Sequence, residues 1–146
     1  MSLTDWQKNG WLKKHQTSPQ EIAALLAVAD RDLKDAKAKG LSDDWRFSIA
    51  YNAALQTSNA ALAASGFTVA KGDSNHFRVI QSLAFTLGLE KGEVDEFDLY
   101  RKKRSKTVYD AAGVITEAES KAIQTFAKEL VEDLREWLSR NHPELL

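Results

Sequence analysis

The distribution of helix breakers constrains this chain more than any other feature of its sequence. Its two prolines, Pro19 and Pro143, lie near the two ends, and the glycines fall at intervals that mark boundaries between long uninterrupted segments. Apolar residues in these segments recur at three- and four-residue spacing, which is typical of amphipathic helices. The sequence offers no extended alternation of β-branched residues that would indicate a strand. It therefore predicts an all-α fold, an antiparallel bundle of four to five helices.

Local start signals place the first and the last helix of this bundle. Ser18 is a capping residue, Pro19 suits the first helical position, and Glu21 is spaced to return the capping bond. The same capping-box pattern recurs from Thr116 to Glu119, which predicts the start of the last helix. The apolar stripe of the first helix comprises Ile22, Leu25, Leu26, Ala29, Leu33 and Ala36, and that of the last comprises Ala122, Phe126, Leu130, Leu134 and Leu138.

Three further helices are expected between these two. The second runs from a cap at Ser42 or Asp43 to Ser65, with Gly66 as its stop, and its many alanines predict a central helix that its neighbours approach closely. A turn at residues 72–74 leads to a third helix that Gly88 ends, and the fourth is expected over about residues 93–111. The shared apolar face of the third helix comprises Phe77, Ile80, Leu83, Ala84 and Leu87.

The chain is expected to form one helical domain over residues 18–142, preceded by an N-terminal segment of residues 1–17. Large aromatic residues at helical spacing usually fill a core, so Trp45 and Trp137 are predicted to be buried. Trp6 and Trp11 belong to the N-terminal segment, which either packs on the bundle or is mobile.

Composition narrows the classes of function. Twenty basic and twenty-one acidic side chains nearly cancel, so any nucleic-acid site must be a local patch rather than an effect of overall charge. The sequence has no cysteine and no apolar run of the length that a membrane span needs, which predicts a cytoplasmic protein away from membranes. Its three scattered histidines suggest no metal site, and no motif indicates a cofactor.

The most unusual local feature is a basic run near the end of the fourth helix. Five cations occupy six positions from Arg101 to Lys106, and such a cluster binds phosphate oxygens well. A purely structural interpretation is also open. The helix begins acidic and ends basic, as its dipole favours, and Asp98 precedes Arg101 and Lys102 at the spacing of surface ion pairs.

Several of these segments together resemble the HEPN family of helical domains. The resemblance covers roughly residues 18–140 and rests on helix order and a few positions rather than on a long motif. The residues that carry it are Tyr51 to Leu55, Ala60 to Gly66, Gly72, His76 and Arg101 to Tyr109.

The resemblance implies a four-helix bundle that often forms a homodimer. In many members it also implies a metal-independent ribonuclease, whose motif is an arginine followed after four to six residues by a histidine. Here Arg104 and Ser105 match the start of that motif, but Tyr109 stands at the histidine position. Tyrosine, with an ordinary pKa near 10, is a poor general base at neutral pH. His76 is a substitute proton acceptor only if the third helix lies beside Arg104.

Three functions follow from these observations. The leading prediction is a non-catalytic module that binds RNA or a nucleotide, with a nucleotidyltransferase of a toxin–antitoxin pair as the partner that the resemblance implies. The alternatives are a metal-independent endoribonuclease that uses Arg104, Tyr109 and His76, and a structural or protein-interaction bundle. The predicted binding residues are Arg101, Lys102, Lys103, Arg104, Lys106 and Tyr109.

Overall fold

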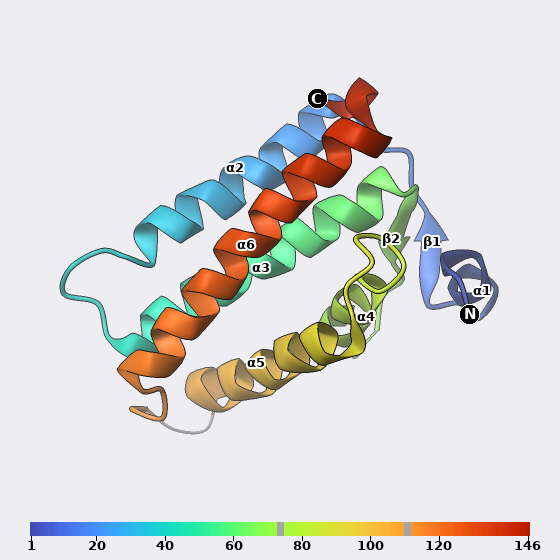
Figure 1. The fold of residues 1–146 in the computed structure, drawn as a ribbon. Helices are drawn as coiled ribbons and strands as arrows, with labels where there is room; N and C mark the ends of the chain where they lie inside the picture. Colours follow the sequence, from blue (N-terminus) through green and yellow to red (C-terminus); the bar gives the residue numbers. More distant parts are fainter. Residues whose placement is uncertain (73–74, 110–111) are drawn as a thin grey trace.

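The computed structural model describes residues 1–72, 75–109 and 112–146, with the side chains of all of these except 108 and 109. Helices dominate the described chain, which confirms the predicted all-α fold (Figure 1). The elements are α1 (Leu3–Lys8), β1 (Leu12–Lys14), α2 (Pro19–Asp35), α3 (Asp43–Ala64), β2 (Phe67–Val69), α4 (Asn75–Ser82), α5 (Lys91–Tyr109), α6 (Glu117–Asn141) and the 3-10 turn η1 (Pro143–Leu145).

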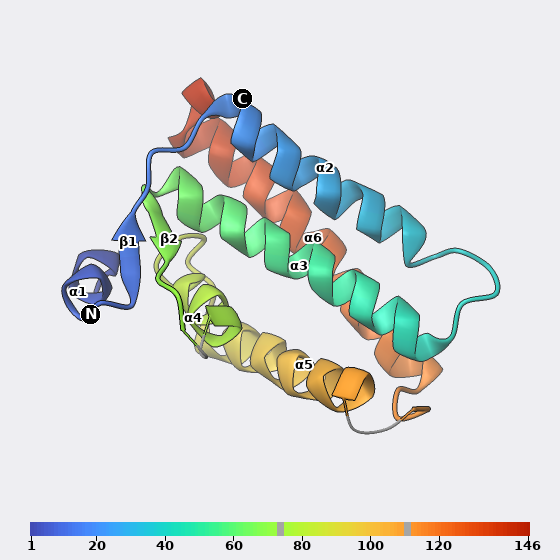
Figure 2. The same cartoon turned by 180° about the vertical axis from the view of Figure 1, so that it is seen from behind.

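Helix α3 occupies the centre of the bundle. It packs against α2 and α6 on one side and against α4 and α5 on the other. The two views in Figures 1 and 2 show that α2 and α5 run opposite to α3 and α6, so the long helices α2, α3, α5 and α6 alternate in direction along the chain. The chain thus forms the expected antiparallel bundle.

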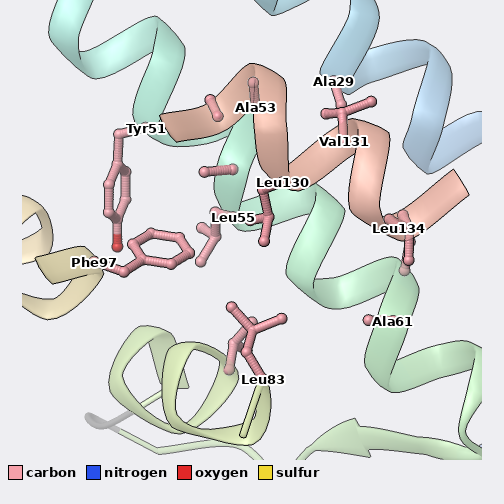
Figure 3. Packing of buried hydrophobic residues seen from close by; sticks show 14 of the residues in the cluster. Ala29, Tyr51, Ala53, Leu55, Ala61, Leu83, Phe97, Leu130, Val131 and Leu134 are labelled. Carbon is pink, nitrogen blue, oxygen red and sulfur yellow. The ribbon is translucent and has the colours of Figure 1, made fainter. Parts of the chain in front are cut away.

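The alanines of α3 explain why so many neighbours reach it. Ala53, Ala60 and Ala61 are fully buried, and a small side chain keeps a neighbouring helix close to the backbone. Larger core side chains from α5, α6 and the turn after α4 pack around this helix, as Figure 3 shows for Phe97, Leu130, Leu134 and Leu83. The prediction of a closely approached central helix is confirmed.

The helix starts lie where the capping residues predicted them. Side chains of Ser18, Ser42 and Thr116 each accept a hydrogen bond from the backbone N–H three residues later. The prediction for Glu21 is wrong, because its carboxylate does not return to the cap. It instead accepts hydrogen bonds from the Thr17 hydroxyl, at 2.6 Å, and from the His15 ring.

The Thr116 cap gives a direct test of this local energetics. Thr116→Ala removes the hydroxyl that accepts from the N–H of Glu119 at 3.1 Å, and it leaves that donor without its partner. We expect the free energy of unfolding to fall by about 1 kcal/mol in a urea titration. Thr125→Ala is the matched control, because Thr125 is exposed within the same helix, and it should change stability by less than about 0.5 kcal/mol. Equal losses in both variants would contradict the assigned cap.

Two predicted apolar faces are partly wrong. In α6 the residue Ala122 is exposed, and the buried apolar positions of its first half are Ile123 and Ala127. A strict four-residue repeat drifts around a helix of 3.6 residues per turn, so its first member falls outside the buried face. Helix α4 ends at Ser82, before Ala84, which is exposed in the turn that follows. The predictions for residues 73–74 and 111 lie outside the described residues.

Trp45 is the clearest error among the predicted core residues, since 62% of its surface is exposed. It lies in the first turn of α3 and lines a cavity of about 550 Å³ together with Asp44 and Thr107. The helix is covered over most of its length, but this first turn extends to the end of the bundle. Trp137 is half-buried and packs against the core, in line with its prediction.

The N-terminal segment packs on the bundle through a short two-stranded sheet that the sequence did not predict. Strand β1 pairs antiparallel with β2, with Leu12 opposite Val69. Trp6 is buried in a small apolar cluster with Leu12 and Leu62 of α3. Of the two alternatives for this segment, the structure shows the packed one. Figure 2 shows α1 and β1 beside β2 at one end of the bundle.

None of the helices in the described ranges combines the length and the apolar character that crossing a membrane requires.

Candidate functional site

The basic run lies on the second half of α5, and the structure divides its cations into two groups. Three of them have carboxylate partners. Arg101 donates from Nε to Asp98 at 2.7 Å, Lys102 lies 3.6 Å from the same carboxylate, and Lys103 pairs with Glu119 of α6. Three of the five cations in this run therefore form ion pairs within the protein, as the structural interpretation of the run expects. Lys106 is exposed, and the side chain of Tyr109 lies outside the described part of the chain.

Arg104 differs from its neighbours because it turns toward the bundle. Its guanidinium carbon lies 5.5 Å from the centre of the Tyr51 ring of α3, within the range of a cation–π contact. Its Nε is buried and has no hydrogen-bond partner among the described residues. A buried donor without a partner is costly, and no described residue offsets this cost. The terminal nitrogens of this guanidinium are not among the buried unpaired atoms, so they are the groups that an acceptor from outside the bundle would meet.

Tyr51 connects Arg104 to the only histidine of α4. The hydroxyl of Tyr51 and Nδ1 of His76 lie 3.2 Å apart, and their rings are 5.9 Å apart. Figure 3 shows Tyr51 beside Phe97 of α5, whose ring meets it edge-on. Helix α4 therefore lies beside the arginine helix, which is the condition that the sequence set for a role of His76. We refer to Tyr51, His76, Arg101 and Arg104 as the Arg104 cluster.

The electrostatics of the Arg104 cluster keep both of its titratable rings neutral at pH 7. Burial raises the pKa of Tyr51, although the two arginines oppose this shift. Burial lowers the pKa of His76, and the positive charges of Arg104 and Arg101 lower it further. The cluster thus presents two fixed cations beside a neutral imidazole and a neutral phenol.

The direction of the hydrogen bond between Tyr51 and His76 is set by the tautomer of the imidazole. The phenol donates to Nδ1 when the ring proton is on Nε2, and it accepts from Nδ1 when the proton is there. In both tautomers the two rings stay neutral, and the positive charge of the cluster comes from Arg104 and Arg101. Guanidinium groups of this kind bind the oxygens of a phosphate group.

The lowered pKa of His76 predicts a specific dependence of stability on pH. The unfolded chain takes up a proton near pH 6.5, the ordinary value, whereas the folded chain resists it. Stability is therefore expected to fall as the pH decreases through this value. Urea titrations at pH 7.5 and 5.5 should show a smaller loss in a His76→Asn variant than in the parent chain. The same loss in both proteins would show that His76 is not the responsible group.

The structure brings together some of the predicted site residues and adds others. Arg104 and His76 meet at the Tyr51 ring, and the charge of Arg101 acts on both titratable rings, whereas Lys102 and Lys103 turn toward carboxylates. Tyr51 is the residue that sequence reasoning missed as a site member, although it belongs to the segment that carries the family resemblance. Its apolar spacing in an alanine-rich helix marked it as core, and nothing in the sequence indicates the arginine that covers it.

No group of three or more metal-ligating side chains occurs among the described residues. A comparison with models of protein families finds none that matches this chain, and a search among curated proteins likewise finds no match. What supports a function is therefore the geometry of the Arg104 cluster, together with the resemblance in the sequence.

Proposed function

We propose that this chain is a HEPN-like helical protein that binds RNA or a nucleotide at the Arg104 cluster without cleaving it. The observation that carries the proposal is Arg104 itself. It stacks on the buried Tyr51, its Nε lacks a partner among the described residues, and no described carboxylate pairs with it. A guanidinium held in this way offers its remaining N–H groups to a phosphate.

Arg101 supports the same ligand from the next turn of α5. Its hydrogen bond with Asp98 uses Nε, and the terminal nitrogens of its guanidinium make no hydrogen bond within the described residues. Asp98 also fixes the orientation of the side chain, which lowers the entropy that a ligand must remove on binding. Two oriented guanidinium groups on one helix face are a phosphate-binding arrangement rather than a base-reading one.

The absence of cleavage is proposed on chemical grounds. A ribonuclease of this kind needs a base to take the proton of the ribose 2′-hydroxyl, and Tyr109 in the histidine position is too weak an acid–base group at neutral pH. His76 is neutral, but burial and the charges of Arg104 and Arg101 lower its pKa, which makes it a weaker base than an ordinary histidine. The cluster is thus better suited to holding a phosphodiester than to breaking one.

The wider features implied by the resemblance belong to the same proposal. A homodimer and a nucleotidyltransferase partner in a toxin–antitoxin-like pair are what membership of the HEPN family would imply. Size-exclusion chromatography with light scattering tests the first, and co-purification with candidate nucleotidyltransferases tests the second.

Binding of end-labelled single-stranded RNA and transfer RNA, at low salt and without added metal, tests the proposal. We expect the parent chain to retain intact RNA and Arg104→Ala to bind about tenfold more weakly, because it loses charge-assisted hydrogen bonds. Arg140→Ala is the matched control: Arg140 is an exposed arginine of α6 that pairs with Glu136, and its loss should change affinity less than twofold. Equal weakening in the two variants would remove the site assignment, and no retention would favour a protein-interaction role.

A second candidate function is the metal-independent endoribonuclease, which the position of His76 beside Tyr51 favours. The same incubations distinguish it, because cleavage that disappears in both Arg104→Ala and His76→Ala would show an active nuclease. The Tyr109→His variant, which restores the histidine of the family motif, is incubated with RNA in the same way. Cleavage created by that substitution in an inert parent would identify a scaffold that lacks only its base.

A further inference from the structure

Arg104 is one of three arginines that each lie over an aromatic ring on this side of the molecule. Arg101 lies 5.6 Å from the ring centre of Phe77, on α4. Arg78, one residue further on, lies 5.6 Å from the same ring and 3.6 Å from the ring of Trp11. The contacts of Arg101 and Arg78 share the Phe77 ring, and Arg104 follows Arg101 by one turn of α5, so the four contacts form one continuous feature. We call it the arginine–aromatic row, made of Tyr51, Arg104, Arg101, Phe77, Arg78 and Trp11.

This row crosses three parts of the chain that are distant in sequence. It begins between α3 and α5, follows α4 and ends on the N-terminal segment, which the β1–β2 pairing holds in place. Phe77, Arg78 and Trp11 are half-buried, so each ring or guanidinium keeps an accessible part. A shallow groove of about 230 Å³ continues the row past Trp11, and it is lined by Gly10, Lys71 and Asn75 in addition to Trp11 and Arg78.

A single mononucleotide needs only the Arg104 cluster, so the remaining length of the row requires an explanation. Guanidinium groups in sequence match the repeated phosphates of a nucleic-acid backbone, and aromatic rings with bound arginines provide faces on which bases stack. Stacking of this kind needs bases that are not already stacked in a duplex. Lys71 adds a further cation at the far end, where it is exposed.

We infer that the arginine–aromatic row binds a single-stranded RNA oligonucleotide, with phosphates along Arg104, Arg101 and Arg78 and a base at the Trp11 groove. This inference rests on the proposed function and specifies its ligand as an extended single strand. Arg78 and Trp11 are then binding residues that lie outside the basic run of α5. The N-terminal segment becomes part of the binding surface rather than an appendage of the bundle.

The test measures affinity as a function of ligand length, by fluorescence anisotropy with labelled oligouridylates and by competition with uridine monophosphate. Affinity for the parent chain should rise with length until the strand spans the row. Arg78→Gln should weaken binding of a twelve-nucleotide strand about fivefold to tenfold while leaving that of the mononucleotide within twofold. It should also reduce the slope of log affinity against log salt by about 0.7, the contribution of one phosphate contact in a single strand.

Two further measurements separate a binding role of Arg78 from a structural one. Arg78→Lys keeps the charge but not the planar stack, so it should restore the salt slope and only part of the affinity. Thermal unfolding of each variant shows whether the N-terminal segment has been lost. If Arg78→Gln binds the long strand like the parent while Arg104→Ala does not, the row is wrong and the proposed function stands. If neither RNA nor mononucleotide binds the parent, the proposed function itself fails.

A duplex of the same length serves as the control ligand. It presents phosphates but no free bases, so it should bind more weakly than the single strand and should be insensitive to Trp11→Ala. Equal affinity for the duplex and the single strand would overturn the inference, because the row would then contact the phosphate backbone alone.

Discussion

Phe97→Ala is expected to lower the free energy of unfolding by about 3 to 5 kcal/mol, a large part of the stability of a domain of this size. Phe97 is fully buried, and its ring lies edge-on to those of Tyr51 and Phe126, at 5.9 Å and 5.2 Å. Truncation removes both aromatic contacts and leaves a cavity in the middle of the bundle. Urea titration followed by circular dichroism measures the loss, and the midpoint of thermal unfolding should fall by roughly 10 °C or more.

Leu99 provides the matched control for this prediction, because it lies on the same helix with 61% of its surface exposed. Leu99→Ala should change the free energy of unfolding by less than about 0.5 kcal/mol. A comparable loss in the two variants would mean that the face of α5 that carries Leu99 is covered in solution. That result would point to an interface, such as the dimer proposed above.

Ala60→Leu is expected to destabilise the protein by about 1 to 3 kcal/mol, although it adds apolar surface. Ala60 is fully buried in α3, which has helices packed on both sides, so the larger side chain must displace a neighbouring helix or adopt a strained rotamer. The same titrations measure the effect. A loss of stability would show that neighbouring helices pack closely at Ala60. A neutral result would show that there is unfilled space beside this alanine.

The control is an alanine of the helix surface. Ala27→Leu adds the same atoms at an exposed position of α2, where they meet no neighbour, and should be close to neutral. A stabilised Ala60→Leu protein would contradict the packing of α3, since it would show unfilled space beside that helix.

The sequence predicted the parts of the fold whose causes are local. Ser42 and Thr116 cap helices because their hydroxyls reach donors three residues away, a relation that the sequence contains in full. Trp45 shows the opposite case. Helical spacing placed it on an apolar face, but its exposure depends on where the bundle ends, and spacing along one helix carries no information about that.

The same distinction holds for the candidate site. The basic run was visible in the sequence, but the partners of its members were not. Lys103 pairs with Glu119 of α6, and Arg104 lies over the ring of Tyr51 of α3. The stack of Arg78 on Trp11 was missed entirely, because contacts between residues distant in sequence bring the two together, the β1–β2 pairing and the packing of Trp6 on Phe85 among them. Short strands of three residues have too little pattern to be predicted from alternation.

That pairing also sets an order of assembly. Strand β1 comes before α2 and α3 in the chain, but its partner β2 follows both of them, and Trp6 further contacts Phe85 beyond α4. A chain that folds as it is synthesised therefore makes the α2–α3 hairpin while its first residues still lack a partner. Contacts between such distant residues form late, because closing the intervening loop costs entropy. The N-terminal segment is thus expected to dock last during folding and to detach first under mild denaturant.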